Sequence, residues 1–194
     1  MTAQNVIDYA KYGELKQLAI KDDVPAVLSY INLAIIEVYK RFNLKISEEI
    51  VTLSENITEY TMPGDFMLLS AVYDENGEML PINDEDDPYS ILTPSYNTIQ
   101  VPNAADGASL SVMYKPEPTF IVNVTDVVPI PIQVLECLLH YIGYRGHGSV
   151  SGDLKTENNS HYMRFEASVQ RVYDLGLITV DTVPTSFQPN KEMP

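Results

Sequence analysis

The stretch of residues 22–42 constrains the fold more than any other part of the chain. Its sequence, DDVPAVLSYINLAIIEVYKRF, opens with two helix-start signals: Asp23 is a favourable N-cap residue, and Pro25 falls in the first turn, where its missing N–H costs no hydrogen bond. Apolar side chains then recur at helical spacing, and polar ones leave only a narrow strip for solvent. The apolar set is Val27, Leu28, Ile31, Leu33, Ala34, Ile35, Ile36, Val38 and Phe42. A helix this apolar must be covered on most sides, so the sequence predicts the central helix of a helical bundle.

Helical spacing also occurs on both sides of this stretch and supplies candidates to cover it. Residues 4–19 form a short helix by this criterion, with Gly13 as the point where it is expected to divide. Prolines 129 and 131 introduce a helix that runs to about Tyr144, and we expect the glycines at 143, 146 and 148 to break it.

A last helix is predicted from about residue 157 to residue 175. Gly176 stands where a C′ glycine belongs. Residues 177–194 contain three prolines and no periodicity, which predicts an extended C-terminal arm. Within the arm, Val180, Val183 and Phe187 are the apolar side chains that would order on a partner.

The chain between the helices reads as short β-strands. Turn signals recur every eight to twelve residues from 46 to 126, and Asn76-Gly77 predicts a hairpin turn with positive φ at both positions. The sequence therefore predicts an α+β protein. Residues 1–45 and 127–176 would form a bundle of three to four helices, and residues 46–126 an inserted antiparallel β-sandwich or barrel.

Charge is distributed very unevenly along the chain. The net charge is −15, and residues 46–126 hold fifteen acidic residues against one base, Lys115. Such a unit argues against binding the phosphate backbone, which requires Lys and Arg. The excess acid either serves solubility or keeps a polyanion from adhering.

The sequence lacks the features that are typical of membrane, secreted and disulfide-bonded proteins. The sequence has no apolar run of the length that spans a bilayer and no secretory pattern, so we expect no membrane association and synthesis in a host cytoplasm. Cys137 is the only cysteine, which rules out an intramolecular disulfide.

Catalytic and metal sites find little support in the pattern. Glu136, Cys137, His140 and Tyr144 share one predicted helix, but no HExxH motif or second cluster accompanies them, and the neighbouring leucines favour a buried thiol. His147 and His161 could approach one another without making a closed site. No phosphate-binding loop or nucleophile elbow occurs, so we expect no enzyme activity, cofactor or metal. Thirteen tyrosines favour interfaces instead.

Four segments together resemble a known family. They are residues 30–42, residues 60–66, residues 112–118 and the proline-led helix from Val128. Their arrangement, helices on both sides of a β-insertion, is similar to the head-to-tail adaptor (head-completion or neck) proteins of tailed bacteriophages. The resemblance extends over most of residues 22–176.

The resemblance implies a structural protein of the virion neck. Its members form dodecameric rings under the portal, continue the DNA channel and offer a platform to the next tail or neck protein. DNA would pass without specific binding. On this reading Asp84, Glu85, Asp86 and Asp87 are candidates for lining the channel, and the arm would bind the portal or a neighbouring copy. Two alternatives remain open: an acidic sugar- or protein-binding module of a phage or bacterial surface, and a hydrolase with an unrecognised carboxylate pair.

Overall fold

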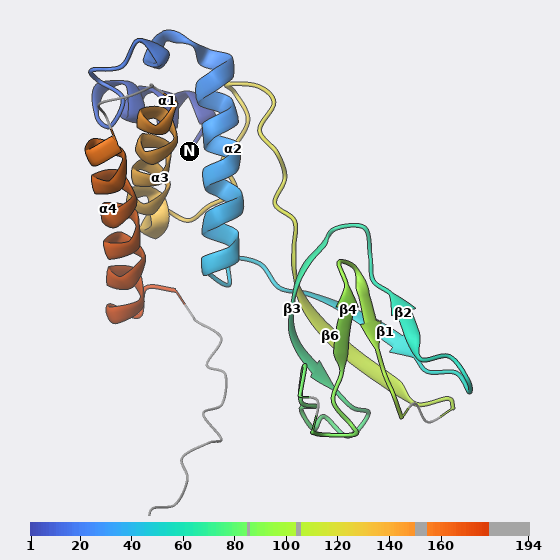
Figure 1. Cartoon of the computed structure of the whole chain (residues 1–194). Coiled ribbons are helices and arrows are strands. Elements are labelled where there is room, and N and C mark those ends of the chain that lie inside the picture. The colour runs from blue at the N-terminus through green and yellow to red at the C-terminus, as the bar shows by residue number, and fades with distance from the viewer. Residues whose placement is uncertain (85, 104–105, 150–154, 179–194) are drawn as a thin grey trace, which may run out of the picture.

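The structure is a computed structural model that describes residues 1–84, 86–103, 106–149 and 155–178. Four helices pack side by side: α1 (Ala3–Tyr12), α2 (Val24–Arg41), α3 (Leu135–Gly148) and α4 (Lys155–Asp174). Two small antiparallel sheets lie beyond the C-terminal end of α2 (Figure 1). Short 3₁₀ turns, η1 (Ala19–Asp22) and η2 (Ile132–Val134), precede α2 and α3. The predicted α+β class is confirmed.

Helix α2 has the predicted start and the predicted apolar stripe. The Asp23 carboxylate accepts from the Ala26 amide at 3.1 Å, and Pro25 lies in the first turn. The buried side chains are Val27, Ile31, Ala34, Ile35, Val38 and Tyr39. They pack against α1, α3 and the segment that returns from the sheets to α3.

That returning segment is fastened to α2 by side chain–backbone hydrogen bonds. Asn32 donates to the Ile121 carbonyl at 2.9 Å and accepts from the Ile121 amide at 2.8 Å. The Tyr39 hydroxyl donates to the Pro129 carbonyl at 2.9 Å. Figure 1 shows the segment running along α2 from the sheets toward α3. Ile121 and Val124 thus pack with the helices, and the predicted limits of the inserted domain stay a prediction.

The prediction that glycines break the third helix is wrong, because α3 continues through Gly143 and Gly146 to Gly148. Both inner glycines lie where another segment presses on the helix. A Cβ on Gly146 would stand 2.4 Å from Leu15 Cδ2, and one on Gly143 would stand 2.7 Å from the His161 ring. The glycines therefore admit a close neighbour, and the packing offsets their low helix propensity.

The end of α4 follows the prediction. Gly176 has φ +60°, its amide donates to the Tyr173 carbonyl at 2.9 Å, and the Leu177 amide donates to the Val172 carbonyl at 3.2 Å. This pair of bonds is a Schellman motif, in which the left-handed residue is usually glycine.

The sheets share one apolar core. The first has strand order β1 (Ser47–Thr52), β6 (Ser109–Pro116), β3 (Phe66–Tyr73), and the second has order β2 (Glu59–Thr61), β5 (Thr98–Gln100), β4 (Leu92–Ser95). Val112 at the centre of β6 lies opposite Glu49 and Val72. The shared core comprises Val51, Leu53, Met62, Phe66, Val72, Ile91, Ile99, Val101, Leu110, Val112 and Tyr114. In the described residues the two sheets do not close into a barrel.

The Asn76-Gly77 turn differs from its prediction. Only Gly77 has positive φ, at +79°, and the Asp74 carboxylate accepts from the amides of Asn76 and Glu78 at 2.9 and 2.8 Å. The chain after the turn makes a single bridge, Tyr73 to Met79, instead of a paired strand. The aspartate side chain thus supports a turn that does not require positive φ at both positions.

Replacing Ile35 by aspartate should prevent folding. Ile35 is 1% exposed, and an unpaired carboxylate there should cost about 4 kcal/mol or more of the free energy of unfolding, a large part of the total for a domain of this size. Ser29→Asp, at an exposed position of the same helix, is the matched control and should melt close to the wild type. Thermal unfolding followed by circular dichroism measures both. An unchanged melting temperature for Ile35→Asp would mean that this side chain faces solvent.

Candidate functional site

All three histidines of the chain gather around one residue, Glu14. His140 and His147 lie two turns apart on α3, His161 lies on α4, and Glu14 lies in the loop after α1. Glu14 Oε2 is 2.7 Å from His161 Nδ1, and Glu14 Oε1 is 3.3 Å from His140 Nδ1. The predicted approach of His147 and His161 is present, since their rings stack with centroids 4.3 Å apart. We call these four residues the histidine cluster.

The histidine cluster ties the loop after α1 to the α3–α4 pair. His147 Nε2 is 3.1 Å from the Glu14 carbonyl oxygen, so this one residue is held through both its backbone and its side chain. Leu15, next in the chain, is fully buried against Gly146. The loop is thus fixed by one apolar and one polar residue in succession.

Charge and burial set the protonation of the cluster. Contact with His140 lowers the pKa of Glu14, with burial opposing it and His161 and Arg164 adding attraction. Burial lowers the pKa of His161, because desolvation disfavours the imidazolium, and Glu14 only partly offsets this effect. The cluster therefore keeps the ionised Glu14 carboxylate beside the His161 imidazole, which resists protonation.

A cavity of about 320 Å³ opens beside the histidine cluster. Its walls include Lys16, Gln17, Ser160 and Arg164 as well as Glu14. Within the described ranges, no three His, Cys, Asp or Glu side chains are placed to hold a metal ion. The arrangement joins three segments of the bundle: the loop after α1, α3 and α4.

The sequence analysis singled out the three histidines of this cluster, but it identified neither Glu14 nor the contacts among the four residues. Glu14 is separated from His140 by 126 positions, and periodicity within one helix says nothing about such a pair. The available signal was the spacing of His140, Gly143 and His147, which places two histidines and a glycine along one face of α3.

The other residues considered for catalysis are Cys137, Glu136 and Tyr144. Cys137 is fully buried among apolar side chains such as Val134 and Phe165, and burial raises the pKa of its thiol, which disfavours the reactive thiolate. Glu136 is mostly exposed and lies 3.6 Å from His140. Tyr144 packs on the Tyr141 and Tyr162 rings. The interpretation of Cys137 as a buried apolar residue is confirmed.

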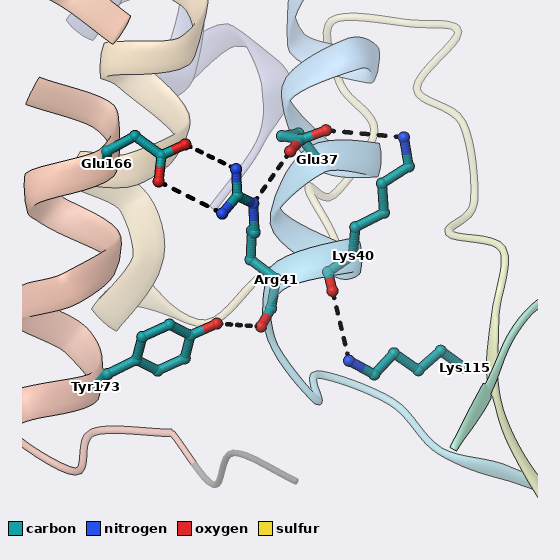
Figure 2. Close-up of polar contacts among 6 residues, drawn as sticks. All are labelled: Glu37, Lys40, Arg41, Lys115, Glu166 and Tyr173. Carbon is teal, nitrogen blue, oxygen red and sulfur yellow. Dashed lines mark hydrogen bonds and ion pairs between the residues drawn. The ribbon is translucent and has the colours of Figure 1, made fainter. Parts of the chain in front are cut away.

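A second polar site joins α2 to α4 at the bottom of the bundle (Figure 2). Arg41 Nη2 is 2.7 Å from Glu166 Oε1 and its Nη1 donates to Oε2 at 3.4 Å, while its Nε is 3.2 Å from Glu37. The guanidinium also lies 5.7 Å from the centre of the Phe165 ring. One arginine thus links two carboxylates and an aromatic face, a combination that lysine cannot reproduce.

The last carbonyls of α2 are satisfied by other parts of the chain. The Tyr173 hydroxyl of α4 donates to the Arg41 carbonyl, and Lys115 Nζ of β6 donates to the Lys40 carbonyl at 3.5 Å (Figure 2). A cation at this position also favours the negative end of the helix dipole. Lys115, the single base of residues 46–126, is only 6% exposed. It therefore connects the sheets to the bundle instead of neutralising their outer surface.

The acidic candidates lie in a self-supporting loop. Asp84 accepts from the Asp86 amide at 3.1 Å, Asp87 accepts from the Tyr89 amide at 2.8 Å, and the Ser90 hydroxyl accepts from the Asp84 amide at 2.9 Å. Glu85 lies outside the described residues, as do Val180, Val183 and Phe187 of the arm.

Comparison with known proteins decides the family. The SU10 adaptor protein family matches residues 2–186, nearly the whole chain. The chain belongs to this family. No curated protein matches the sequence. The match confirms the resemblance to phage head-to-tail adaptors, whose helices on both sides of a β-insertion appear in the fold described above.

Membership of the adaptor family indicates what kind of protein this is. An adaptor family indicates a structural protein rather than an enzyme, and its association is with other head or tail proteins. Among the helices described here, none has the length and apolar character needed to cross a bilayer. The histidine cluster joins the loop after α1 to α3 and α4, and the Arg41 site joins α2 to α4.

The histidine cluster should make stability sensitive to mild acid. The folded pKa of His161 lies below its ordinary 6.5, so on acidification the unfolded chain takes up this proton first and the free energy of unfolding falls below about pH 6.5. Each unit of lowering is worth about 1.4 kcal/mol. His161→Gln should remove this step, whereas His140, His147, Arg164 and Glu14 remain in both proteins. Urea unfolding at a series of pH values between 7 and 5 measures the difference.

A second loss should follow at lower pH. The pKa of Glu14 is below its ordinary 4.5, so its contribution is present above that value and disappears as the pH falls through the folded pKa. Identical pH profiles for the wild type and His161→Gln between pH 6.5 and 5 would mean that the ring is not held neutral by burial.

Replacing Arg41 by methionine should loosen α4 from α2. The change keeps an unbranched apolar stem but leaves Glu166 and Glu37 without their shared cation, which should cost about 1–3 kcal/mol of unfolding free energy. Arg171→Met is the control, because Arg171 is 69% exposed and reaches Glu136 only at 3.8 Å. Exposed pairs of this kind contribute about 0–1 kcal/mol. Equal melting temperatures for the two variants would contradict a role for Arg41 in joining the helices.

Proposed function

We propose that this adaptor assembles into a closed homo-oligomeric ring, of twelve copies, beneath the portal in the neck of the virion. The ring continues the DNA channel and presents a platform to the next tail or neck protein. The observation that carries this proposal is the match to the adaptor family over residues 2–186. A ring of identical copies uses head-to-tail contacts that close by rotation.

The exposed apolar side chains support contacts between copies. Tyr12, Tyr89 and Tyr96 are 76%, 67% and 70% exposed, and Phe120 is 53% exposed. Tyrosine and phenylalanine at the surface are typical of protein–protein interfaces, where they supply area at a small entropic cost.

The charge distribution supports the passage of DNA without binding. Residues 46–126 contain fifteen acidic residues and one base, Lys115, which is buried at the end of α2. A surface of this kind repels phosphate over about one Debye length, roughly 8–10 Å at physiological salt. We assign the loop of Asp84, Glu85, Asp86 and Asp87 to the channel wall or rim on this ground.

The C-terminal arm completes the proposed assembly. Val180, Val183 and Phe187 are the side chains through which it would bind the portal ring or a neighbouring copy. An extended segment with an aromatic anchor commonly binds by filling a pocket or by adding a strand.

Assembly with portal tests the proposal. The full chain is mixed with purified portal rings, sedimented, and the stoichiometry of the complex is measured by native mass spectrometry. A ring of twelve chains per portal ring is the expected result. A chain that stays monomeric and does not co-sediment with portal would overturn the proposed function.

The acidic loop should matter for DNA but not for folding. Changing positions 84–87 together to lysine removes the two exposed loop hydrogen bonds that the Asp84 and Asp87 carboxylates accept, so the melting temperature should fall only slightly. The bond from the Asp84 amide to the Ser90 hydroxyl does not need the carboxylates. The change should impair DNA packaging, retention or ejection. The control carries the same change of charge elsewhere in the insertion, at the exposed positions Glu48, Glu49, Glu55 and Glu59. DNA content and ejection from particles assembled at low ionic strength are measured. Normal transit through the loop variant would mean that the loop faces away from DNA.

A further inference from the structure

An apolar groove of about 280 Å³ lies between the last turns of α2 and the sheets. Its walls come from four separate parts of the chain: Ile36 of α2, Met67 of β3, Tyr96 of the β4–β5 turn, and Pro118 with Phe120 of the returning segment. Tyr96 and Phe120 are left largely exposed at its mouth. Two aromatic rings over an apolar floor form a suitable pocket for another aromatic side chain.

We propose that this groove receives Phe187 of the protein's own C-terminal arm. The arm leaves α4 at the correct end of the molecule, because Ile178 packs against the buried cluster that contains Phe42, the residue at the end of α2. Ile36 lies six residues before Phe42, which is about 9 Å along a helix axis. Phe187 follows Ile178 by nine residues, and a chain of that length spans up to about 30 Å when extended. The groove is therefore within reach of the same copy.

The composition of the arm fits the groove. Phe187 is the only aromatic residue in residues 179–194, and Pro184 and Pro189 on either side of it favour an extended chain. Lys40 and Glu117 border the groove, and the arm carries Asp181, Lys191 and Glu192. Each charge at the groove thus has a charge of opposite sign available in the arm.

Attachment in the same chain compensates for the small size of the groove. One aromatic anchor gives a weak contact between separate molecules, but a short tether raises the effective concentration to the millimolar range. The arm would then be held against its own subunit until a partner competes for Phe187. This inference does not depend on the ring, since it concerns the isolated chain.

Disulfide trapping in the full-length chain tests the proposal. Thr119→Cys is placed at the exposed rim of the groove and Ser186→Cys beside the anchor, so that Phe120 and Phe187 both stay intact. The native Cys137 is buried, and the single variant Ser186→Cys reports any reaction with it. The control pair combines Ser186→Cys with Met163→Cys. Met163 is 67% exposed on α4, fifteen residues before Ile178, which is within about 23 Å along the helix and thus within reach of the arm.

The rates of intramolecular disulfide formation decide the outcome. We expect the Thr119–Ser186 pair to close at least about tenfold faster than the control pair, and Phe187→Ala to bring its rate down to that of the control. Equal rates for the two pairs would overturn the proposal and indicate an unattached arm. Disulfide-linked dimers whose share rises with protein concentration would also overturn it, and would assign the groove to the arm of another copy.

Discussion

The need to cover α2 governs the arrangement of the whole chain. Its buried stripe includes side chains from Val27 to Tyr39, and no single neighbour can shield them all. The elements that cover the stripe include α1 before it, α3 after the insertion, and the segment containing Ile121 that returns along it (Figure 1). Because two of these follow the sheets in sequence, the chain must come back to the helix it left. The insertion is therefore anchored at both ends on the same helix, and the positions of the sheets and helices depend on each other.

At the C-terminal end of α2, polar contacts join the bundle to the sheets. A helix end leaves carbonyl groups without partners, and burying them unpaired is costly. Here the Arg41 carbonyl accepts from α4 through Tyr173, and the Lys40 carbonyl accepts from the sheets through Lys115. The Arg41 side chain adds a fork of contacts to Glu166. Two consecutive carbonyls at the end of α2 thus bind α4 and the sheets, which fixes the insertion to the bundle at a defined place.

Local signals in the sequence predicted local structure well, and contacts between distant residues account for what they missed. The N-cap at Asp23 and the left-handed glycine at Gly176 involve only near neighbours, and both are present as predicted. Gly143 and Gly146 were misread as helix breakers because the side chains that press on them, Leu15 and His161, lie far away in sequence. The contacts of the three histidines with Glu14 were not predicted, for the same reason. Of the candidate residues for function, Asp84, Asp86 and Asp87 can be located, but a single chain does not present the surfaces that would face them.

The burial of Lys115 has an electrostatic consequence for the inserted sheets. With the only base of residues 46–126 turned inward, the insertion exposes carboxylates with no cation among them to balance the field. It must gather an atmosphere of mobile counter-ions, whose density depends on the salt around it. A neighbour that brings basic side chains would displace these ions and gain their entropy of release. An acidic neighbour would have to share them, so the sheets discriminate between partners by charge before any contact is made.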